Sequence, residues 1–308
     1  MTPQAPNIDL KSGLLLLVLA SVWGGSFFFA EIALREIGPF TIVLYRVFLA
    51  AVTLFVVVRW KGIEIPRSIK VWLCYLVMGA LNNAIPFSLI FWGQVTIDSG
   101  LASILNGTTA VFGAVVAGLL LVDERLTARK IIGALFGLFG VAVIMGLDAL
   151  TNFDLRNLAQ LAILGAALSY SFAGVWGKRF LGGYPPLMNA FGMLVGSTLL
   201  MIPVTTLTEG SPTLTLSVEV WASISALAFL STAFAYLLYF KILAQVGSAN
   251  LMLVTLLVPP MAIGLSVTFL NEHIGTAAWI GFAFIAFGLA ITDGRLLGKL
   301  KSLKKAEA

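Results

Sequence analysis

Long runs of apolar residues constrain this sequence more than any other feature. One of them, GLLLLVLA at 13–20, opens a stretch as long as the roughly 20 residues that a helix needs to cross the hydrocarbon core of a bilayer. A strand of a membrane barrel would instead alternate apolar and polar residues over about ten positions. The sequence therefore predicts an all-α polytopic membrane protein with ten transmembrane helices. The predicted spans are 13–32, 39–58, 71–91, 99–121, 128–147, 158–178, 187–206, 220–240, 247–270 and 276–292.

The basic residues gather on one side of these spans. Charged residues make up only 11% of the chain, which carries a net charge of +5, whereas about one-quarter of an average soluble chain is charged. If the N-terminus lies inside, 16 of the 19 Lys and Arg residues fall on the inner side. This positive-inside bias predicts a multi-pass protein of the cell (inner) membrane with both termini in the cytoplasm. The lipid bilayer is then the partner that explains the excess of basic residues, and no nucleic-acid partner is expected.

Two segments of the chain repeat one another. IIGALFGLFGVAVI at 131–144 and WIGFAFIAFGLAIT at 279–292 are identical at six of 14 positions, at an offset of 148 residues. This offset carries span five onto span ten, so that five spans map onto five. Since five is odd, the halves cross the membrane in opposite senses and form inverted repeats, an arrangement typical of alternating-access transporters. We predict a cytoplasmic N-terminal segment at 1–12, five-helix repeats at 13–147 and 158–292, and a basic cytoplasmic tail at 293–308.

Four stretches of the sequence resemble a known family. They are LASVWGGSFF in span one, the Tyr45-Arg46 pair in span two, SGLASILNGTTAVFGAVVAGLLLVDERLT in span four and GSANLMLVTLLVPPMAIGLSVTFLNEHI in span nine. Over nearly its whole length the chain resembles the EamA-type ten-helix permeases of the drug/metabolite transporter superfamily. The resemblance implies a central pocket between the halves and the transport of amino acids or other small metabolites, with export favoured over import.

Polar groups at membrane depth are costly and usually face the bundle interior or a water-filled cavity. Asn82 and Asn83 precede Pro86, which cannot donate a hydrogen bond to the carbonyl of Asn82. Interrupted helices mark binding sites in transporters, although prolines can also kink helices for packing alone. The predicted helix-breaking residues at the site are Pro86, Pro259 and Pro260. The predicted substrate-binding residues are Trp23, Asn82, Asn83, Asn106, Thr109, Tyr170, Tyr236 and Thr255; packing inside the bundle is the alternative role for the aromatic ones.

Two charged residues are candidates for a role in recognition or coupling. Arg46 lies seven residues into span two, about 10 Å deep, and an ionisable residue at that depth is a functional candidate. It either binds a substrate carboxylate through its bidentate fork or caps backbone carbonyls as a structural clamp. Glu31, at the outer end of span one, is a candidate for coupling; facilitated diffusion and exchange are the alternatives.

Other classes of protein fit the sequence less well. It contains no HExxH, no G-x-S-x-G and no Walker A loop, so we do not expect an enzyme. The single histidine, His273, makes no metal site, and we expect no cofactor. A membrane sensor or scaffold is the alternative to a transporter, and a vitamin, nucleoside or drug is the alternative substrate class. The expected partners are a small-molecule substrate and the bilayer, with the chain as a monomer or homodimer.

Overall fold

The computed structural model describes residues 10–121, 127–145, 155–251 and 254–293, and every element in these ranges is a helix. The α-helices are α1 (Leu10–Ala33), α2 (Pro39–Trp60), α3 (Ile69–Gly79), α4 (Ile85–Gln94), α5 (Ser99–Asn106), α6 (Thr109–Leu120), α7 (Ala128–Met145), α8 (Leu155–Phe180), α9 (Pro186–Thr208), α10 (Val218–Ser225), α11 (Ala235–Leu251), α12 (Val254–Phe269) and α13 (Thr276–Asp293). Two π-helical segments are η1 (Ala80–Ala84) and η3 (Ala226–Phe234).

These elements combine into the predicted ten spans. Span three is the continuous run α3–η1–α4, span four is α5–α6, and span eight is α10–η3–α11. Eight helical runs in the described ranges are long and apolar enough to cross a membrane, and shorter apolar helices lie at 257–269 and 276–291. The prediction of an all-α polytopic protein is therefore confirmed. Most of the predicted basic tail and most of the predicted N-terminal segment lie outside the described residues.

One predicted loop is wrong. The interval 241–246 was expected to be a cytoplasmic turn between spans eight and nine, but α11 continues through it to Leu251. The residues KILAQV contain neither proline nor glycine, and Leu, Ala, Gln and Lys all favour helix. Ile242 is fully buried, so packing also favours a continued helix over an exposed turn. A lone lysine in an apolar run was therefore too weak a signal of a loop.

The pair α7 and α13 shows the symmetry of the two repeats directly. A Cβ added to Gly140 would collide with the carbonyl of Gly281, and one added to Gly288 would collide with the carbonyl of Gly133. The offset of 148 residues maps the first of these contacts onto the second. The helices therefore run antiparallel with their backbones in close approach, which only residues without a side chain permit.

Aromatic side chains on α7 and α13 repeat this symmetry. Phe136 and Phe284, which are repeat counterparts, stack on each other with ring centroids 6.3 Å apart. The ring of Phe136 meets that of Phe287 edge-on, and Phe139 meets Phe284 in the same way, with interplanar angles of 82° and 81°. The two halves are thus inverted repeats, related by an axis that passes between these helices.

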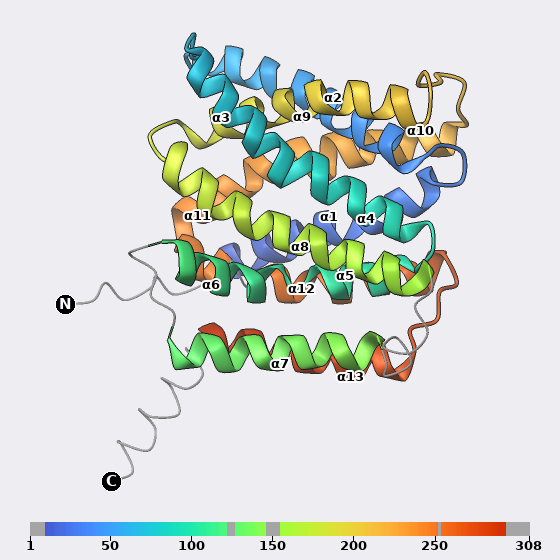
Figure 1. Ribbon diagram of the computed structural model, residues 1–308. Coiled ribbons are helices and arrows are strands. Elements are labelled where there is room, and N and C mark those ends of the chain that lie inside the picture. The colour runs from blue at the N-terminus through green and yellow to red at the C-terminus, as the bar shows by residue number, and fades with distance from the viewer. Residues whose placement is uncertain (1–9, 122–126, 146–154, 252–253, 294–308) are drawn as a thin grey trace, which may run out of the picture.

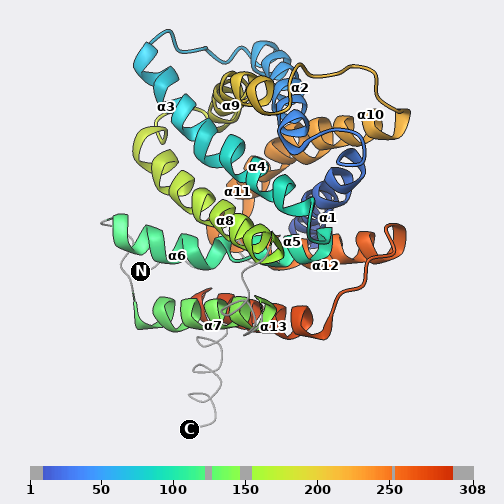
Figure 2. The ribbon, with the colours of Figure 1, turned by 45° about the vertical axis from the view of Figure 1, so that its right-hand side comes forward.

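The helices are stacked in layers, and their axes lie roughly along one direction in Figure 1. The pair α7 and α13 forms the lowest layer in Figure 1, beneath α5, α6 and α12. Figure 2 shows the same separation after a turn of 45°. Helix α2 packs closely against α9, and α1 packs against α12, so that helices from the two halves lie side by side. The lipid-facing side chains are apolar, among them Leu135 and Phe139 on α7.

Candidate functional site

The two π-helical segments occupy equivalent places in the two repeats. Adding 148 to η1 (80–84) gives 228–232, which lies within η3 (226–234). A π-helical turn accommodates an extra residue, and such turns occur often at functional sites. Pro86 follows η1 directly and removes one helical donor. In η3 the hydroxyl of Thr232 donates to the carbonyl of Leu227, five residues back, at 2.8 Å. Different local chemistry thus produces the same irregularity.

A chain of hydrogen bonds begins at η1 and joins spans three, seven and eight. Asn82 Nδ2 donates to the hydroxyl of Tyr236 at 3.1 Å, and that hydroxyl donates to Asn83 Oδ1 at 3.0 Å. Asn83 Nδ2 in turn donates to Ser197 Oγ at 3.0 Å. Asn83 is completely buried, so the amide depends on these partners for its polar contacts. The predicted residues Asn82, Asn83 and Tyr236 therefore lie together; we call these three residues with Ser197 the amide cluster.

Arg46 lies in the same layer of the bundle and joins spans one, two and eight. Its Nε donates to Thr232 Oγ1 at 2.8 Å and its Nη1 donates to Ser26 Oγ at 2.9 Å. A longer bond of 3.4 Å runs from Nη2 to the carbonyl of Ser231. Only 4% of Arg46 is exposed. Its partners come from η3 and α1, so this residue ties the first repeat to the second.

The guanidinium of Arg46 lies against aromatic rings. Its Cζ is 3.8 Å from the centre of the Phe87 ring and 5.6 Å from that of Phe91, within the range of cation–π attraction. Tyr170 packs edge-on against Phe87 with the ring centroids 6.5 Å apart. Thr232, which bonds to Arg46, lies four residues before Tyr236, about one helical turn away. Among the predicted residues, Arg46 and Tyr170 are therefore neighbours of the amide cluster.

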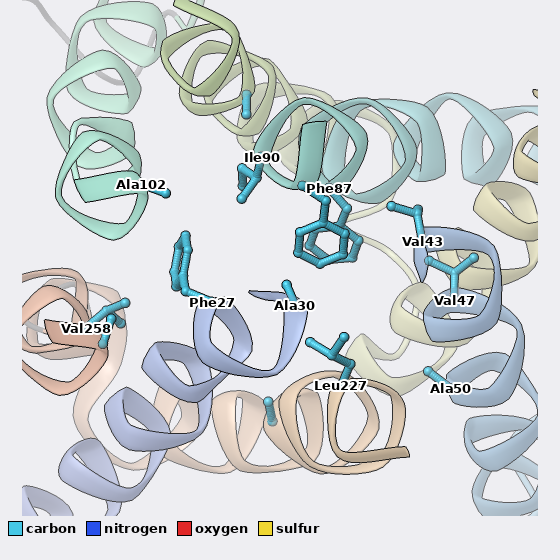
Figure 3. Packing of buried hydrophobic residues seen from close by; sticks show 14 of the residues in the cluster. Phe27, Ala30, Val43, Val47, Ala50, Phe87, Ile90, Ala102, Leu227 and Val258 are labelled. Carbon is cyan, nitrogen blue, oxygen red and sulfur yellow. The ribbon is translucent and has the colours of Figure 1, made fainter. Parts of the chain in front are cut away.

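Apolar side chains surround this polar layer. Figure 3 shows the ring of Phe87 reaching from α4 toward the space between Ala30 on α1 and Val43 on α2, with Leu227 of η3 facing it. All four side chains are buried. In such surroundings electrostatic interactions are stronger than in water, because the local dielectric constant is low.

Other predicted residues lie at a second place, where spans four and nine cross. Span four is interrupted between Asn106 and Thr109, and the hydroxyl of Thr109 donates to the carbonyl of Asn106 at 2.7 Å. A Cβ on Gly107 would contact Pro259 at 3.8 Å. The side-chain oxygen of Asn106 is buried and has no partner among the described residues. Thr255, at the start of α12, is half-buried.

The expected interruption at Pro259 and Pro260 is not observed, since α12 continues as a helix from Val254 to Phe269 with both prolines inside it. A proline removes one hydrogen bond and bends the helix, but the bonds on either side of it keep the helix continuous. The actual interruption lies opposite, in span four, between α5 and α6. Pro259 and Pro260 therefore lie where spans four and nine cross, but the helix interruption that they predicted is in span four.

Two further predicted residues, Trp23 and Glu31, are not members of the amide cluster. Trp23 is half-buried on α1 and its ring packs against that of Tyr239, with centroids 5.9 Å apart. Glu31, near the end of α1, is 3.5 Å from the side-chain nitrogen of Gln94. The amide of Gln94 also donates to the carbonyl of Phe27 at 2.9 Å. Glu31 therefore shares no hydrogen-bond partner with Arg46 among the described residues.

Carboxylates cap the N-termini of α5 and α2. Glu272 accepts hydrogen bonds from the backbone N–H groups of Ser99 and Gly100 at the start of α5, and from the Ser99 hydroxyl. Glu209 accepts from the start of α2 in the same way. A carboxylate at a helix N-terminus pairs with unsatisfied N–H groups and with the positive end of the helix dipole. Burial, together with the nearby Glu272, raises the pKa of Asp98, while Arg156 opposes this effect.

Several residues of the site were missed from the sequence, chiefly Ser26, Ser197 and Thr232. Each is a buried hydroxyl inside an apolar span. Single Ser and Thr residues are common in transmembrane helices, where they bond to their own backbone or to a neighbouring helix. Their position alone therefore carried little signal. Their importance becomes visible only when their partners, Arg46 and Asn83, are placed beside them.

Comparisons with known proteins agree with this architecture. The model of the EamA-like transporter family matches residues 11–146 and again residues 157–292. An uncharacterized transporter of Bacillus subtilis, YoaV, is 25% identical over 272 residues, covering 87% of this chain and 91% of its own. One solved crystal structure of a protein shares the fold, with a TM-score of 0.65 and 18% sequence identity. The similarity covers 91% of this chain and 96% of that one.

Two similar proteins carry more specific names. A probable amino-acid metabolite efflux pump of Escherichia coli is 26% identical over 294 residues, which cover 91% of this chain and 94% of the pump. A probable terminal-alkyne amino-acid exporter of Streptantibioticus cattleyicolor is also 26% identical over 294 residues, with coverage of 95% and 97%. The similarity in each case extends over nearly both full lengths.

Proposed function

Because the chain belongs to the EamA-like transporter family, we propose that it is a secondary transporter that exports small organic solutes, such as amino acids or related metabolites. Solute crosses between the two inverted repeats by alternating access. Two similar proteins are named as an amino-acid metabolite efflux pump and an amino-acid exporter, which favours this substrate class and this direction. The protein resides in the cell inner membrane with both termini in the cytoplasm, as the distribution of basic residues favours.

One observation supports transport above all others: buried polar side chains from both repeats meet at the two π-helical segments. Tyr236 of the second repeat bonds to Asn82 and Asn83 of the first, and Arg46 of the first bonds to Thr232 of the second. Hydrogen bonds across the repeats can form in one conformation and exchange in another. Polar groups in the membrane interior face a pathway or pair with one another, and these do so where the halves meet.

The predicted residues have distinct roles in this proposal. The amide cluster with Tyr170 lines the central part of the path. Asn106, Thr109 and Thr255 lie at the crossing of spans four and nine and contribute to the path there, while Trp23 adds an apolar wall. Glu31 acts at the outer end, where its carboxylate couples transport or gates the exit.

Metabolite profiling of cells and medium tests this function. Bacteria that express the wild type are compared with bacteria that express Asn83→Ala, Tyr236→Phe, or the control Val56→Ala, which changes a lipid-facing side chain 61% exposed on α2. Membrane levels of all four are matched by immunoblot. We expect one or a few amino-acid-like metabolites to accumulate in the medium with the wild type and with Val56→Ala, and much less with the other two variants.

Other outcomes of the profiling have clear meanings. Depletion of a solute from the medium would establish import in place of export. If purified protein in liposomes moved no solute found in the cell extract, the transport function would be wrong and a sensor or scaffold would be favoured. Equal accumulation with all four chains would show that the amide cluster lies off the path.

A further inference from the structure

The charge of Arg46 is not balanced by any acidic side chain that the structure describes. The residue is only 4% exposed. Its hydrogen-bond partners are two hydroxyls and one carbonyl, all neutral, and Tyr170 packs against the same Phe87 ring as the guanidinium. Burying a charge without a partner of opposite sign costs several kcal/mol by order of magnitude. Neutral acceptors and the face of Phe87 offset part of this cost.

The guanidinium also has unused donors. It carries five N–H groups, and three of them have acceptors among the described residues: one on Nε, one on Nη1 and one on Nη2. One N–H therefore remains on each terminal nitrogen, and two N–H groups are what a carboxylate needs for bidentate binding. The hydroxyl of Tyr170 likewise makes no hydrogen bond to a described residue.

The location of these unused donors matches a binding site for solute. Arg46 lies about 10 Å from the start of α2 and contacts η3, so it is within the membrane and next to the contact between the repeats. Unlike an exposed arginine, it cannot exchange its missing partners for bulk water without opening the bundle. A structural clamp would account for the three bonds that are made, but not for two donors and a tyrosine hydroxyl left without acceptors.

We propose that the transported solute carries a carboxylate, and that Arg46 binds this carboxylate with its two unused N–H groups while Tyr170 donates a third hydrogen bond. This inference rests on the proposed transport function and names the substrate class: amino acids and other organic acids, in preference to amines or uncharged solutes. The apolar surroundings of Phe87 exclude water and strengthen the pair. The binding is reversible because both partners can be solvated again when the bundle opens.

A panel of matched solutes tests the inference. Each set shares one side chain: L-leucine, isoamylamine, which lacks the carboxylate, and isocaproate, which lacks the amine; and likewise L-phenylalanine, phenethylamine and hydrocinnamate. Thermal unfolding of the purified protein in detergent reports binding, and flux into liposomes reports transport. We expect at least one carboxylate to stabilise the wild type and to be transported at least about tenfold faster than the amine of its set, as loss of a charged hydrogen bond predicts.

Three variants separate binding from support of the fold. Arg46→Gln keeps a donor for Ser26 or Thr232 but removes the charge, and should bring the carboxylate-to-amine ratio close to one. Thr232→Val removes one bond to Arg46 while keeping its charge, and should lower both rates together without changing the ratio. Tyr170→Phe should weaken carboxylate binding several-fold, which a role in packing alone would not do.

The outcomes distinguish this inference from the proposed function. Equal transport of acids and amines by the wild type, a preference for acids retained in Arg46→Gln, or a lack of stabilisation by every carboxylate in the panel would each overturn the carboxylate site. Stabilisation by a carboxylate without any flux would leave the site standing and overturn the transport function. If Arg46→Gln does not fold, Arg46→Lys, which keeps the charge but loses the bidentate fork, and Tyr170→Phe should each lower the carboxylate-to-amine ratio, and an unchanged ratio in both would overturn the carboxylate site.

Discussion

The two repeats make equivalent contacts with different chemistry. The π-helical segment of span three meets span seven through the neutral pair Asn83 and Ser197, whereas that of span eight meets span two through Thr232 and the charged Arg46. The offset of 148 residues pairs the spans that make these contacts, three with eight and seven with two; it maps Asn83 to Ser231, next to Thr232, and Arg46 to Leu194, three residues before Ser197. The backbone irregularity is thus shared, and the charge is present on one side only. The difference teaches that two repeats can share a backbone irregularity while the side chains beside it differ in charge.

Removal of the Arg46 charge should have the largest effect on the difference between the two contacts. Arg46→Leu places the residue of the symmetric position, Leu194, at the charged contact. Hydrogen bonds to a charged group contribute about 1.5–3 kcal/mol each, so we expect transport of a carboxylate solute to fall about ten- to a hundredfold. Flux in liposomes, normalised to folded protein by size-exclusion chromatography, measures this. A variant with more than half of the wild-type flux would contradict the importance of the charge.

A substitution at the neutral contact of Asn83 with Ser197 should have a smaller effect than removal of the Arg46 charge. Asn83→Ala removes the partners of Ser197 and Tyr236 in a fully buried place, which destabilises the protein by about 1–3 kcal/mol. The midpoint of thermal unfolding in detergent should fall by several degrees, and Val56→Ala serves as the lipid-facing control. An unchanged midpoint would mean that the amide cluster contributes nothing to the contact between repeats.

The tyrosine hydroxyl that joins the two sides should have a smaller effect. Tyr236→Phe loses one donated and one accepted bond, both neutral, and we expect destabilisation of about 1 kcal/mol. A double-mutant cycle with Asn83→Ala measures the part that comes from their direct bond. Strictly additive effects of the two substitutions would exclude an energetic coupling across the repeats at this place.

The smallest expected effect concerns the end of the bundle and depends on pH. Burial raises the pKa of Asp98, so the folded state binds its proton more tightly than the unfolded state does. Ionisation of Asp98 therefore weakens the fold as pH rises through the folded pKa, and Asp98→Asn should stabilise the protein slightly at neutral pH. Unfolding midpoints of both chains should converge at acidic pH, where Asp98 is protonated. A constant difference at every pH would assign the effect to packing.

The sequence was sufficient for the fold and for part of the site. Apolar runs locate helices because the bilayer leaves the backbone no other partners, and six identities between spans five and ten were enough to indicate inverted repeats. Asn82, Asn83 and Tyr236 were predicted as site residues, and the structure brings them together. Their functional role stays a prediction.

The partners of the charged residue could not be predicted. Arg46 and Thr232 are 186 residues apart, and nothing in the local pattern of either span records the contact. The two π-helical segments were missed as well, since η3 contains no proline that would have marked it. The break in span four was misplaced into span nine because a proline bends a helix more readily than it ends one.

The glycine contacts between α7 and α13 have a consequence for how such a chain can be assembled. Gly140 against Gly281 and Gly133 against Gly288 form an isologous interface, in which the same surface patch is used twice. Two copies of a single five-helix half, inserted in opposite orientations, could form this interface without any new contact. The chain is thus built like a dimer joined covalently, and because the two halves are one chain, equivalent positions can carry different residues, as Arg46 and Leu194 do.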